Sequence, residues 1–362
     1  MFVSHLSLKD FRSYENLELS LKAGQNIFIG ENGEGKTNII EALMYLALLS
    51  SHRISNDQPL IKLGSERAYI RAKIESDERT TLVELEINNS KANRAKVNQN
   101  PVRSQKELLG LVKSVCFSPE DLDLVRGDPS ERRSFLDQLL IQQSPRLAGV
   151  ISDYERALKQ RNSLLKSRAP ESSLRSWSEH LATFGGELIA GRIKLINEIE
   201  PLFQIAYKNL SAKKLAKLGY KSSIPAPSSE KEVNKEVMLK VIEEVKSQEI
   251  ERGISLVGPH RDDLILNLGD HPVKGYASHG ESWSIALALR LASYQLFINE
   301  GAKPILILDD VFSELDEGRR EKLLEIADSA EQTFITVAVE NDLPKAIQGA
   351  RFKVELGKVV TL

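Results

Sequence analysis

The chain has 362 residues, of which 41% are hydrophobic and 28% are charged, and its formal net charge at pH 7 is −2. This length and composition are typical of a globular protein with one large α/β domain and an attached lobe. A membrane-spanning segment is excluded because no apolar run reaches about 18 residues, so we expect no membrane partner. The charge also excludes a protein that binds nucleic acid through a general excess of positive charge, and any DNA contact must come from a local patch.

The N-terminal segment and the cysteine content indicate the cellular compartment. Residues 1–21 alternate apolar and polar side chains like an edge strand, and they lack the basic-then-apolar order of a signal peptide. Cys116 is the only cysteine, so no internal disulfide can form, which fits a reducing cytoplasm. Apolar neighbours flank Cys116, and we predict a buried core residue rather than a nucleophile. We therefore expect a cytoplasmic protein.

The first 115 residues read as strands in hairpins, interrupted by one helix. Apolar residues at helical spacing, from Ile39 to Ala47, predict that helix within residues 37–50. Alternating or continuous apolar runs bounded by turn residues predict strands at 2–11, 14–24, 25–30, 68–76, 80–88 and 94–103.

The middle of the chain is helical, and strands return after it. Helical runs cover 132–143, 147–167, 174–203 and 235–253, with a Pro/Ser-rich loop near 222–232. A strand near 254–269, a long apolar helix at 282–301, a strand at 303–311, a helix at 319–331 and strands at 332–339 and 351–356 follow. Short apolar strands that alternate with helices indicate a largely parallel, buried sheet. We predict an α/β ATPase core formed by 1–116 and 253–362, split by a mostly helical insertion at 117–252.

The stretch IGENGEGKT contains the nucleotide-binding pattern G-x-x-x-x-G-K-T, and it lies between a predicted strand and a predicted helix. In that setting backbone N–H groups and the helix N-terminus bind phosphate. Lys36 would reach the β- and γ-phosphates, and the Thr37 hydroxyl would coordinate Mg²⁺. The predicted ATP-binding residues are Gly30, Glu31, Asn32, Gly33, Glu34, Gly35, Lys36 and Thr37.

A second element of an ATPase site lies far downstream. The segment ILILDD, residues 305–310, is an apolar strand that ends in two carboxylates, as a Walker B element does. We predict that Asp309 holds Mg²⁺ and that Asp310, with Lys36, is catalytic, Asp310 by orienting or deprotonating the attacking water. A carboxylate pair is also a common end for a buried strand, and the prediction depends on its combination with the glycine loop.

Two short motifs resemble parts of the ABC-type ATPases. SHGES, residues 278–282, precedes a helix and resembles their signature motif, and SELD, residues 313–316, resembles their D-loop. That resemblance implies that Ser278 and Gly280 contact the γ-phosphate of a nucleotide held by a second subunit. Ser-Gly turns are also frequent helix caps, which is the alternative for SHGES alone. The same motif order occurs in SMC-like proteins, but the insert here is about 130 residues without sustained heptads, so we expect a head without coiled-coil arms.

Longer segments resemble the RecF family of bacterial recombination-repair ATPases. FSPEDLDLVRGDPSERRSFLD (117–137) and LVGPHRDDL (256–264) look like its two signatures, and FRSYENLEL, SHR (51–53) and YERALKQRNSLLK (154–166) match as well. The resemblance implies an ATPase head with a helical second lobe that forms a homodimer on ATP and then binds DNA. It also implies work in DNA repair and replication, in placing RecA with RecO and RecR partners, and in the SOS response.

Two motifs depart from the wider ABC pattern. The switch histidine expected after residues 332–340 is absent, with Thr336 or a neighbour in its place, and slow turnover would fit this change. The Q-loop has no clear counterpart, and the SPED turn at 118–121 is the best candidate.

Clusters of basic residues are candidates for DNA contact, because phosphate recognition needs only positive charge on a shared face. The alternative is an ordinary solvated helix face, and Arg132 with Arg133 could instead pair with Glu120 or Asp121. We expect the His-Arg pairs at 52–53 and 260–261 to be structural or subunit-contact residues. The DNA candidates are Arg126, Arg132, Arg133, Lys159 and Arg161, with a second group at Lys213, Lys214 and Lys217.

Two other functions fit parts of the pattern. An ABC transporter ATPase subunit would share the nucleotide motifs but would need a surface that docks to a membrane domain. A structural head that binds ATP without useful hydrolysis is the other alternative, against which the carboxylate pair argues only mildly.

Overall fold

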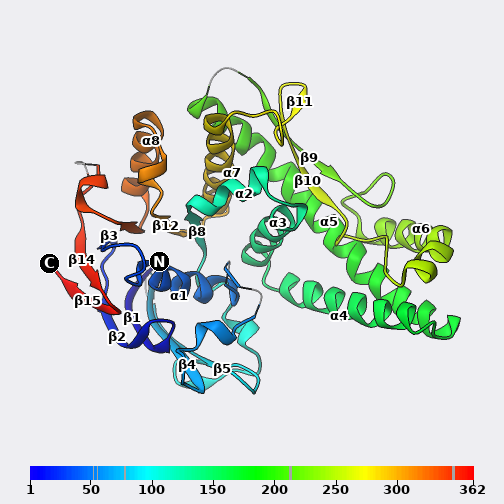
Figure 1. The fold of residues 1–362 in the computed structure, drawn as a ribbon, viewed down its shortest axis with the longest axis horizontal. Coiled ribbons are helices and arrows are strands. Elements are labelled where there is room, and N and C mark those ends of the chain that lie inside the picture. The colour runs from blue at the N-terminus through cyan, green and yellow to red at the C-terminus, as the bar shows by residue number, and fades with distance from the viewer. Residues whose placement is uncertain (52, 55, 77–78, 212–213, 345–346) are drawn as a thin grey trace. The chain divides into compact units, whose positions relative to one another are not determined.

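The computed structural model describes residues 1–51, 53–54, 56–76, 79–211, 214–344 and 347–362. The chain divides into two compact units (Figure 1). Unit 1 is formed by Met1–Asp121 and Leu287–Leu362, and unit 2 by Leu122–Ala286. The predicted insertion, 117–252, ends earlier than unit 2. The difference arises because the strand Asp263–Leu268 pairs with Ala216–Lys221 and so belongs with the inserted segment.

An antiparallel sheet, sheet A, forms one layer of unit 1, with its strands in the order β2-β1-β4-β5-β6-β7. Alternation of apolar and polar residues gives this sheet one buried face, as in β4, where every second residue is buried. The register fixes which residues share that face, for example Leu6 opposite Leu19 on one side and Ala72 on the other. Its strands are β1 (Phe2–Phe11), β2 (Tyr14–Ser20), β4 (Arg67–Ser76), β5 (Arg79–Asn88), β6 (Arg94–Val97) and β7 (Asn100–Pro101).

A second sheet of unit 1, sheet B, has the order β15-β14-β3-β13-β12-β8 and is parallel except for β15. Because β13 lies between β3 and β12, the carboxyl ends of these strands meet at one edge, with Phe28, Thr336 and Asp309 in one row. Ligands of α/β sheets bind at such an edge. The strands are β3 (Gly24–Ile29), β8 (Ser114–Phe117), β12 (Ile305–Asp309), β13 (Gln332–Val337), β14 (Ala350–Glu355) and β15 (Lys358–Thr361).

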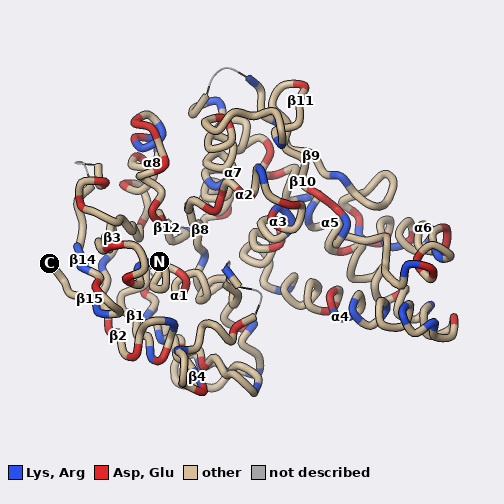
Figure 2. The backbone as a smooth tube through the Cα atoms, in the orientation of Figure 1, with Lys and Arg blue, Asp and Glu red and all other residues tan. Residues whose placement is uncertain are grey.

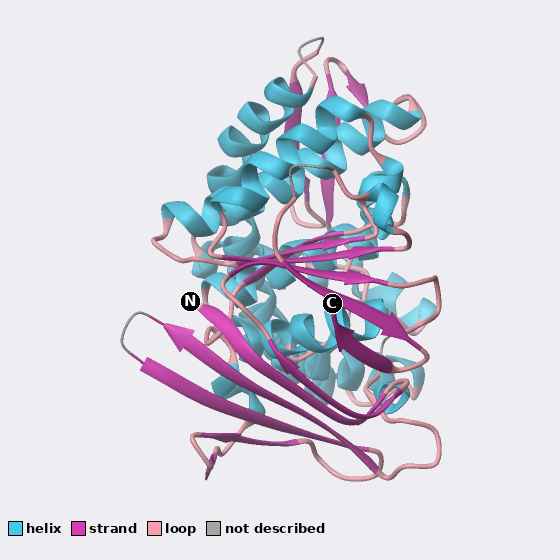
Figure 3. Ribbon diagram, turned by 90° about the vertical axis from the view of Figure 1, so that its left-hand side faces the viewer, coloured by secondary structure: helices cyan, strands magenta, loops and turns pink. Residues whose placement is uncertain are grey.

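Helix α1 (Lys36–Leu48) links the two sheets of unit 1. Its buried residues, Ile40 among them, belong to one core that also contains Leu6 and Ile70 of sheet A and Ile307 of sheet B. Figure 3 shows the two sheets as separate layers of strands. Cys116 lies in the same core, and burial raises the pKa of its thiol, so the prediction of a buried residue is confirmed. Helix α8 (Glu317–Ser329) completes unit 1.

Unit 2 is mostly helical, as the sequence predicts. Its helices are α2 (Leu122–Arg126), α3 (Pro129–Gln143), α4 (Leu147–Lys166), α5 (Glu171–Leu210) and α6 (Lys231–Arg252). A three-stranded sheet, in the order β11-β10-β9, contains β9 (Ala216–Lys221), β10 (Asp263–Leu268) and β11 (His271–Pro272). Strand β9 was not predicted from the sequence. Helix α7 (His279–Asn299) begins in unit 2 and ends in unit 1.

The residues that the structure describes include no helix that combines the length and the apolar character needed to cross a bilayer.

Candidate nucleotide site

The glycine loop joins β3 to α1 at the carboxyl edge of sheet B. Gly33 and Gly35 have φ values of +90° and +115°, which side-chain-bearing residues rarely adopt. Gly35 is also the N-cap residue of α1 and provides no side-chain cap. The first N–H groups of α1 therefore lack a side-chain cap at the end of the helix where the dipole favours an anion.

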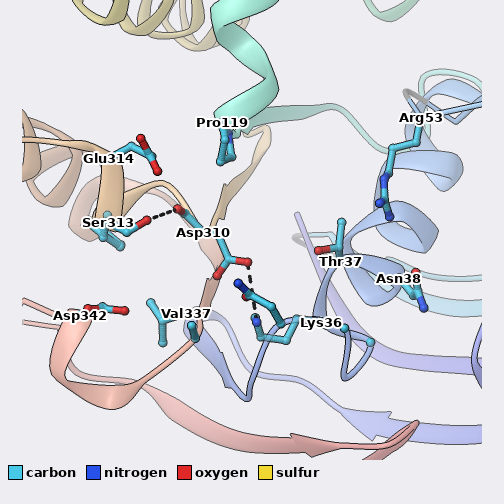
Figure 4. Close-up of a pocket in the computed structure, with 15 residues that line it drawn as sticks. Lys36, Thr37, Asn38, Arg53, Pro119, Asp310, Ser313, Glu314, Val337 and Asp342 are labelled. Atoms are coloured by element: carbon cyan, nitrogen blue, oxygen red, sulfur yellow. Dashed lines mark hydrogen bonds and ion pairs between the residues drawn. The ribbon is translucent and has the colours of Figure 1, made fainter. Parts of the chain in front are cut away.

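A cavity of about 550 Å³ opens in front of this loop (Figure 4). Every residue that lines it belongs to unit 1. Its size lies in the range of small-molecule and cofactor sites. The lining comes from the glycine loop and α1, from the loops after β8, β12 and β13, and from the loop after α1, and includes Asn32, Gly33, Gly35, Lys36, Thr37, Asn38, Arg53, Pro119, Asp310, Ser313, Glu314 and Asp342.

Lys36 is held in the wall of this cavity. Its ammonium group donates to the carbonyl oxygens of Gly30 at 2.7 Å and Glu31 at 3.3 Å, and it lies 3.7 Å from Asp310 Oδ2. Its side chain is only 3% exposed. The loop thus fixes a cation where phosphate oxygens would lie, and the carboxylate of the Walker B strand is beside it. The structure brings together the two residues predicted to be catalytic.

Thr336 organises the end of the Walker B strand. Its hydroxyl donates to Asp309 Oδ1 at 2.6 Å and accepts from the backbone N–H of Asp310 at 2.9 Å. Asp310 has a φ of +48°, outside the usual range for a non-glycine residue. Burial raises the pKa of Asp309 to about 6, against the lowering effect of the Thr336 hydrogen bond, and the negative charge of Asp310 adds to the rise. Thr336, one of the residues expected where the switch histidine is absent, therefore orders the two carboxylate residues at the end of β12.

The site residues fit a magnesium ion. The Thr37 side chain lines the cavity, and Asp309 is a buried carboxylate at the carboxyl edge of the same sheet. Hydroxyl and carboxylate oxygens are the hard ligands that Mg²⁺ prefers, together with phosphate oxygens of a substrate. A cation would favour the ionised form of Asp309, which burial alone disfavours. Thr37 and Asp309 are the residues that would hold the ion.

Arg53, Asn38 and Pro119 line the cavity but were not predicted to bind nucleotide. The Arg53 side chain extends toward Thr37 and Asn38 from the loop that follows α1 (Figure 4). The SHR motif at 51–53 is the sequence signal that covers Arg53, and from it we predict structural or subunit-contact residues. His52 itself lies outside the described residues. Pro119 belongs to the turn suggested as a Q-loop, which remains a prediction.

The signature-like turn, SHGES, lies in unit 2 and begins α7. The Ser278 N–H donates to Glu281 Oε2 at 2.9 Å, and the Glu281 N–H donates to Ser278 Oγ at 3.2 Å. This reciprocal pair is a capping box, which leaves Ser278 exposed at the start of the helix. Within one chain, SHGES therefore forms a helix cap, which is the alternative that the sequence left open. The contact of Ser278 and Gly280 with a second subunit's nucleotide remains a prediction.

Comparison with known proteins places the chain in a family. The family model of the RecF/RecN/SMC N-terminal domain matches residues 2–355. The DNA replication and repair protein RecF of Streptomyces avermitilis is 51% identical over 371 residues, covering 99% of each chain. The chain belongs to the RecF family. A RecF of Cutibacterium acnes is 45% identical over 386 residues, covering 99% of this chain and 98% of the other.

Solved structures agree with this assignment to the RecF family. The recombination mediator protein RecF-ATPrS in the RecFOR pathway matches with a TM-score of 0.92 and 28% identity, covering 100% of this chain and 98% of the other. An SMC head bound to the winged-helix domain of ScpA matches with a TM-score of 0.58 and 16% identity, which concerns the fold alone. The predicted fold, an α/β ATPase head with a helical insertion, is confirmed, and the part of the chain that the structure describes contains no coiled-coil arm. The curated relatives support a role in DNA replication and repair.

Figure 2 shows Lys and Arg interspersed with Asp and Glu along the backbone of α4 and α6. The basic residues predicted to contact DNA differ in their surroundings. Arg126 and Lys159 are exposed, and Arg126 Nε lies 3.4 Å from Ser282 Oγ. Arg133 is half-buried and donates to the backbone oxygen of Asp262 at 2.9 Å. In the second basic group, Lys214 forms an ion pair with Glu281 at 2.8 Å, Lys217 is exposed and Lys213 lies outside the described residues.

Two of these predictions require correction. Arg132 is 5% exposed and pairs with Asp263 at 2.8 Å, rather than with Glu120 or Asp121. Arg161 is 2% exposed and pairs with Glu249 at 2.6 Å. Buried guanidinium groups that carboxylates neutralise are not available to phosphate oxygens. Arg132 and Arg161 are therefore structural residues of unit 2.

The second RecF-like signature, LVGPHRDDL, forms a buried polar network in unit 2. His260 Nδ1 lies 2.5 Å from the Tyr154 hydroxyl, and Asp262 accepts from the Tyr220 hydroxyl at 2.6 Å. Arg192 donates to the backbone oxygen of Pro259 at 2.7 Å. This arrangement supports a structural role for the His-Arg pair at 260–261.

Proposed function

We propose that the chain is an ATP-dependent DNA-binding protein of recombinational repair and replication-fork maintenance, acting in the cytoplasm. In this proposal ATP drives the formation of a homodimer that clamps DNA at gaps. The dimer then helps RecO- and RecR-type mediators to load RecA, with a link to the SOS response. The observation that carries the proposal is the shared cavity of Lys36 and Asp310, in a chain that covers the full length of RecF relatives.

The geometry supports an assignment of roles within the site. Lys36 and the N–H groups at the start of α1 would bind the phosphates of ATP. Thr37 and Asp309 would hold Mg²⁺, which when bound offsets negative charge on the phosphates. Asp310 is partly exposed at 30%, so it can accept a proton from, or orient, a water molecule in the cavity. The expected reaction is weak hydrolysis of ATP to ADP and phosphate, stimulated by DNA.

Slow hydrolysis has specific support. Thr336 takes part in two hydrogen bonds at the end of the Walker B strand, to Asp309 and to the N–H of Asp310. A hydroxyl in that position cannot act as an ionisable switch near neutral pH. A head that binds ATP and hydrolyses it little is therefore the second candidate function. The transporter alternative receives no support from the relatives, which are DNA replication and repair proteins.

Measurements of ATP-dependent dimerisation and of DNA binding test the proposal. With ATP and Mg²⁺, sedimentation should show a dimer, and fluorescence anisotropy should show tighter binding to a gapped duplex. The Lys36→Ala variant should lose both effects, because it removes the buried cation that faces the phosphates. Lys62→Ala serves as a matched control, since Lys62 forms an exposed pair with Glu15 in the same unit. A wild-type chain that stays monomeric with ATP and binds DNA unchanged would contradict the proposal.

A further inference from the structure

The C-terminal hairpin, β14 and β15 with the turn Leu356–Gly357 between them, packs against the glycine loop. Strand β14 runs parallel to β3, the strand that leads into the loop, and pairs with it up to Lys353 opposite Ile29. The turn then reaches the middle of the loop, because the Gly357 N–H donates to the backbone oxygen of Glu34 at 3.2 Å. Two distant parts of the sequence thus meet at the phosphate-binding segment.

Glu34 is bound by this turn through both its backbone and its side chain. Besides the contact with Gly357, its carboxylate accepts a hydrogen bond from the Leu356 N–H. Glu34 is absent from the residues that line the cavity, whereas its neighbours Gly33 and Gly35 line it. The side chain of Leu356 is 88% exposed, so the contribution of Leu356 to this contact comes from its backbone.

Two glycines show how closely the C-terminal hairpin approaches its neighbours in unit 1. A Cβ atom at Gly30 would overlap the backbone oxygen of Val354 in β14. A Cβ atom at Gly357 would lie 2.9 Å from the backbone oxygen of Ser13, and the φ of Gly357 is +74°. Gly30 therefore lets the glycine loop approach β14 at backbone distance, and Gly357 is required by its own positive φ and by the nearby backbone of Ser13.

The charge of Glu34 gives this contact a consequence for nucleotide binding. A carboxylate between two glycines of a phosphate-binding loop would repel the phosphates if it turned toward the cavity. The Leu356 N–H holds that carboxylate on the hairpin side of the loop. We propose that the C-terminal hairpin positions the glycine loop through Glu34 and keeps the Glu34 carboxylate away from the nucleotide phosphates. This inference rests on the proposed ATP site.

Removal of the turn tests the inference. A chain that ends at Glu355 lacks both N–H donors, while β14 keeps its pairing with β3 because β15 is the edge strand. Binding of a fluorescent ATP analogue at low ionic strength should weaken about tenfold, corresponding to about 1.4 kcal/mol. Leu356→Pro removes the donor to the carboxylate within the full-length chain and also displaces the turn, because proline cannot adopt the φ of +44° that Leu356 has. It should weaken binding in the same direction. Circular dichroism and melting temperature report whether each variant is folded.

Glu34→Gln separates this mechanism from general damage. In the full-length chain the variant keeps an acceptor for the Leu356 N–H, and affinity should stay within about twofold of the wild type. In the shortened chain and in Leu356→Pro, the same substitution removes an unrestrained charge and should restore affinity by about threefold or more.

Glu355→Gln is the control, because Glu355 lies on the same hairpin and pairs with Lys353 instead. The inference is wrong if the shortened chain and Leu356→Pro bind the analogue like the wild type. It is equally wrong if Glu34→Gln has the same effect with and without the turn. A wild-type chain that binds no ATP would instead overturn the proposed function.

Discussion

At the scale of single residues, His260 is a titratable group whose surroundings oppose its charge. Burial lowers its pKa from 6.5 to about 4, although the backbone oxygen of Ser255 accepts from its ring, and the nearby Arg261 and Arg133 add to the lowering. The neutral ring pairs with Tyr154 inside unit 2. Protonation of His260 therefore competes with folding of this unit.

The sign of the resulting pH dependence follows from the lowered pKa. Above pH 6.5 the ring is neutral in the folded and unfolded chain, and the stabilisation is fully present. As the pH falls from 6.5 to 4, mainly the unfolded chain gains the proton, so the free energy of unfolding should decrease, by about 3.4 kcal/mol at most. Urea titrations at pH 7.5, 6 and 5 measure this decrease. His260→Gln should flatten this decrease, whereas His271→Gln, at an exposed position of β11, should not. Equal slopes for all three proteins would contradict the assignment.

Arg53 is a second residue whose role is testable by itself. Its guanidinium group extends into the cavity that Lys36 and Asp310 share. One additional charge contact to a polyphosphate contributes on the order of 1–1.5 kcal/mol. We expect Arg53→Ala to weaken ATP binding about tenfold without a change in melting temperature. Calorimetric titration measures the affinity, Arg103→Ala at an exposed position of the same unit is the control, and unchanged affinity would remove Arg53 from the site.

At the scale of secondary-structure elements, local patterns predicted most helices and strands but not their partners. The helix after the glycine loop was predicted from its helical spacing of apolar residues, and the strand ILILD from a short continuous apolar run that ends in carboxylates. Strand β9 was missed, since its lysines suggested a basic surface segment and its pairing partner, β10, lies more than 40 residues away. The prediction that Arg132 and Arg161 contact DNA failed for the same reason. A pattern of charged residues does not reveal that a carboxylate far away in the sequence neutralises an arginine.

Helix α4 contains a direct test of that distinction. Arg161 is buried against Glu249, Ser178 and Ser255, while Lys159 is exposed on the same helix. Arg161→Ala leaves a buried carboxylate without its cation and should lower the free energy of unfolding by about 3–5 kcal/mol. Lys159→Ala should change it by less than about 0.5 kcal/mol. Urea denaturation measures both, and equal stabilities would show that the buried pair contributes little.

At the scale of the whole molecule, the sequence predicted the part of the nucleotide site that lies within one chain better than the part expected from a second copy of the chain. Lys36, Thr37 and Asp310 line one cavity because parallel strands of one sheet bring their carboxyl ends together. Ser278 belongs to unit 2, and its predicted partner is a second copy of the chain. No pattern within one chain specifies that arrangement, and so it rests on the resemblance of SHGES to a signature motif.

Substitution of Ser278 tests whether this residue of a second copy of the chain completes the nucleotide site. Ser278 is exposed, and its hydroxyl accepts from the Glu281 N–H, so Ser278→Arg places a long cation at a helix start without disturbing the core. We expect ATP affinity within about twofold of the wild type but no ATP-dependent dimer in sedimentation. Asp310→Asn should act in the opposite direction, because it removes the carboxylate expected to activate water, and should accumulate an ATP-bound dimer that binds DNA more tightly. Asp270→Asn, an exposed acid in unit 2, should dimerise like the wild type. A Ser278→Arg chain that dimerises normally would leave SHGES as a helix cap and nothing more.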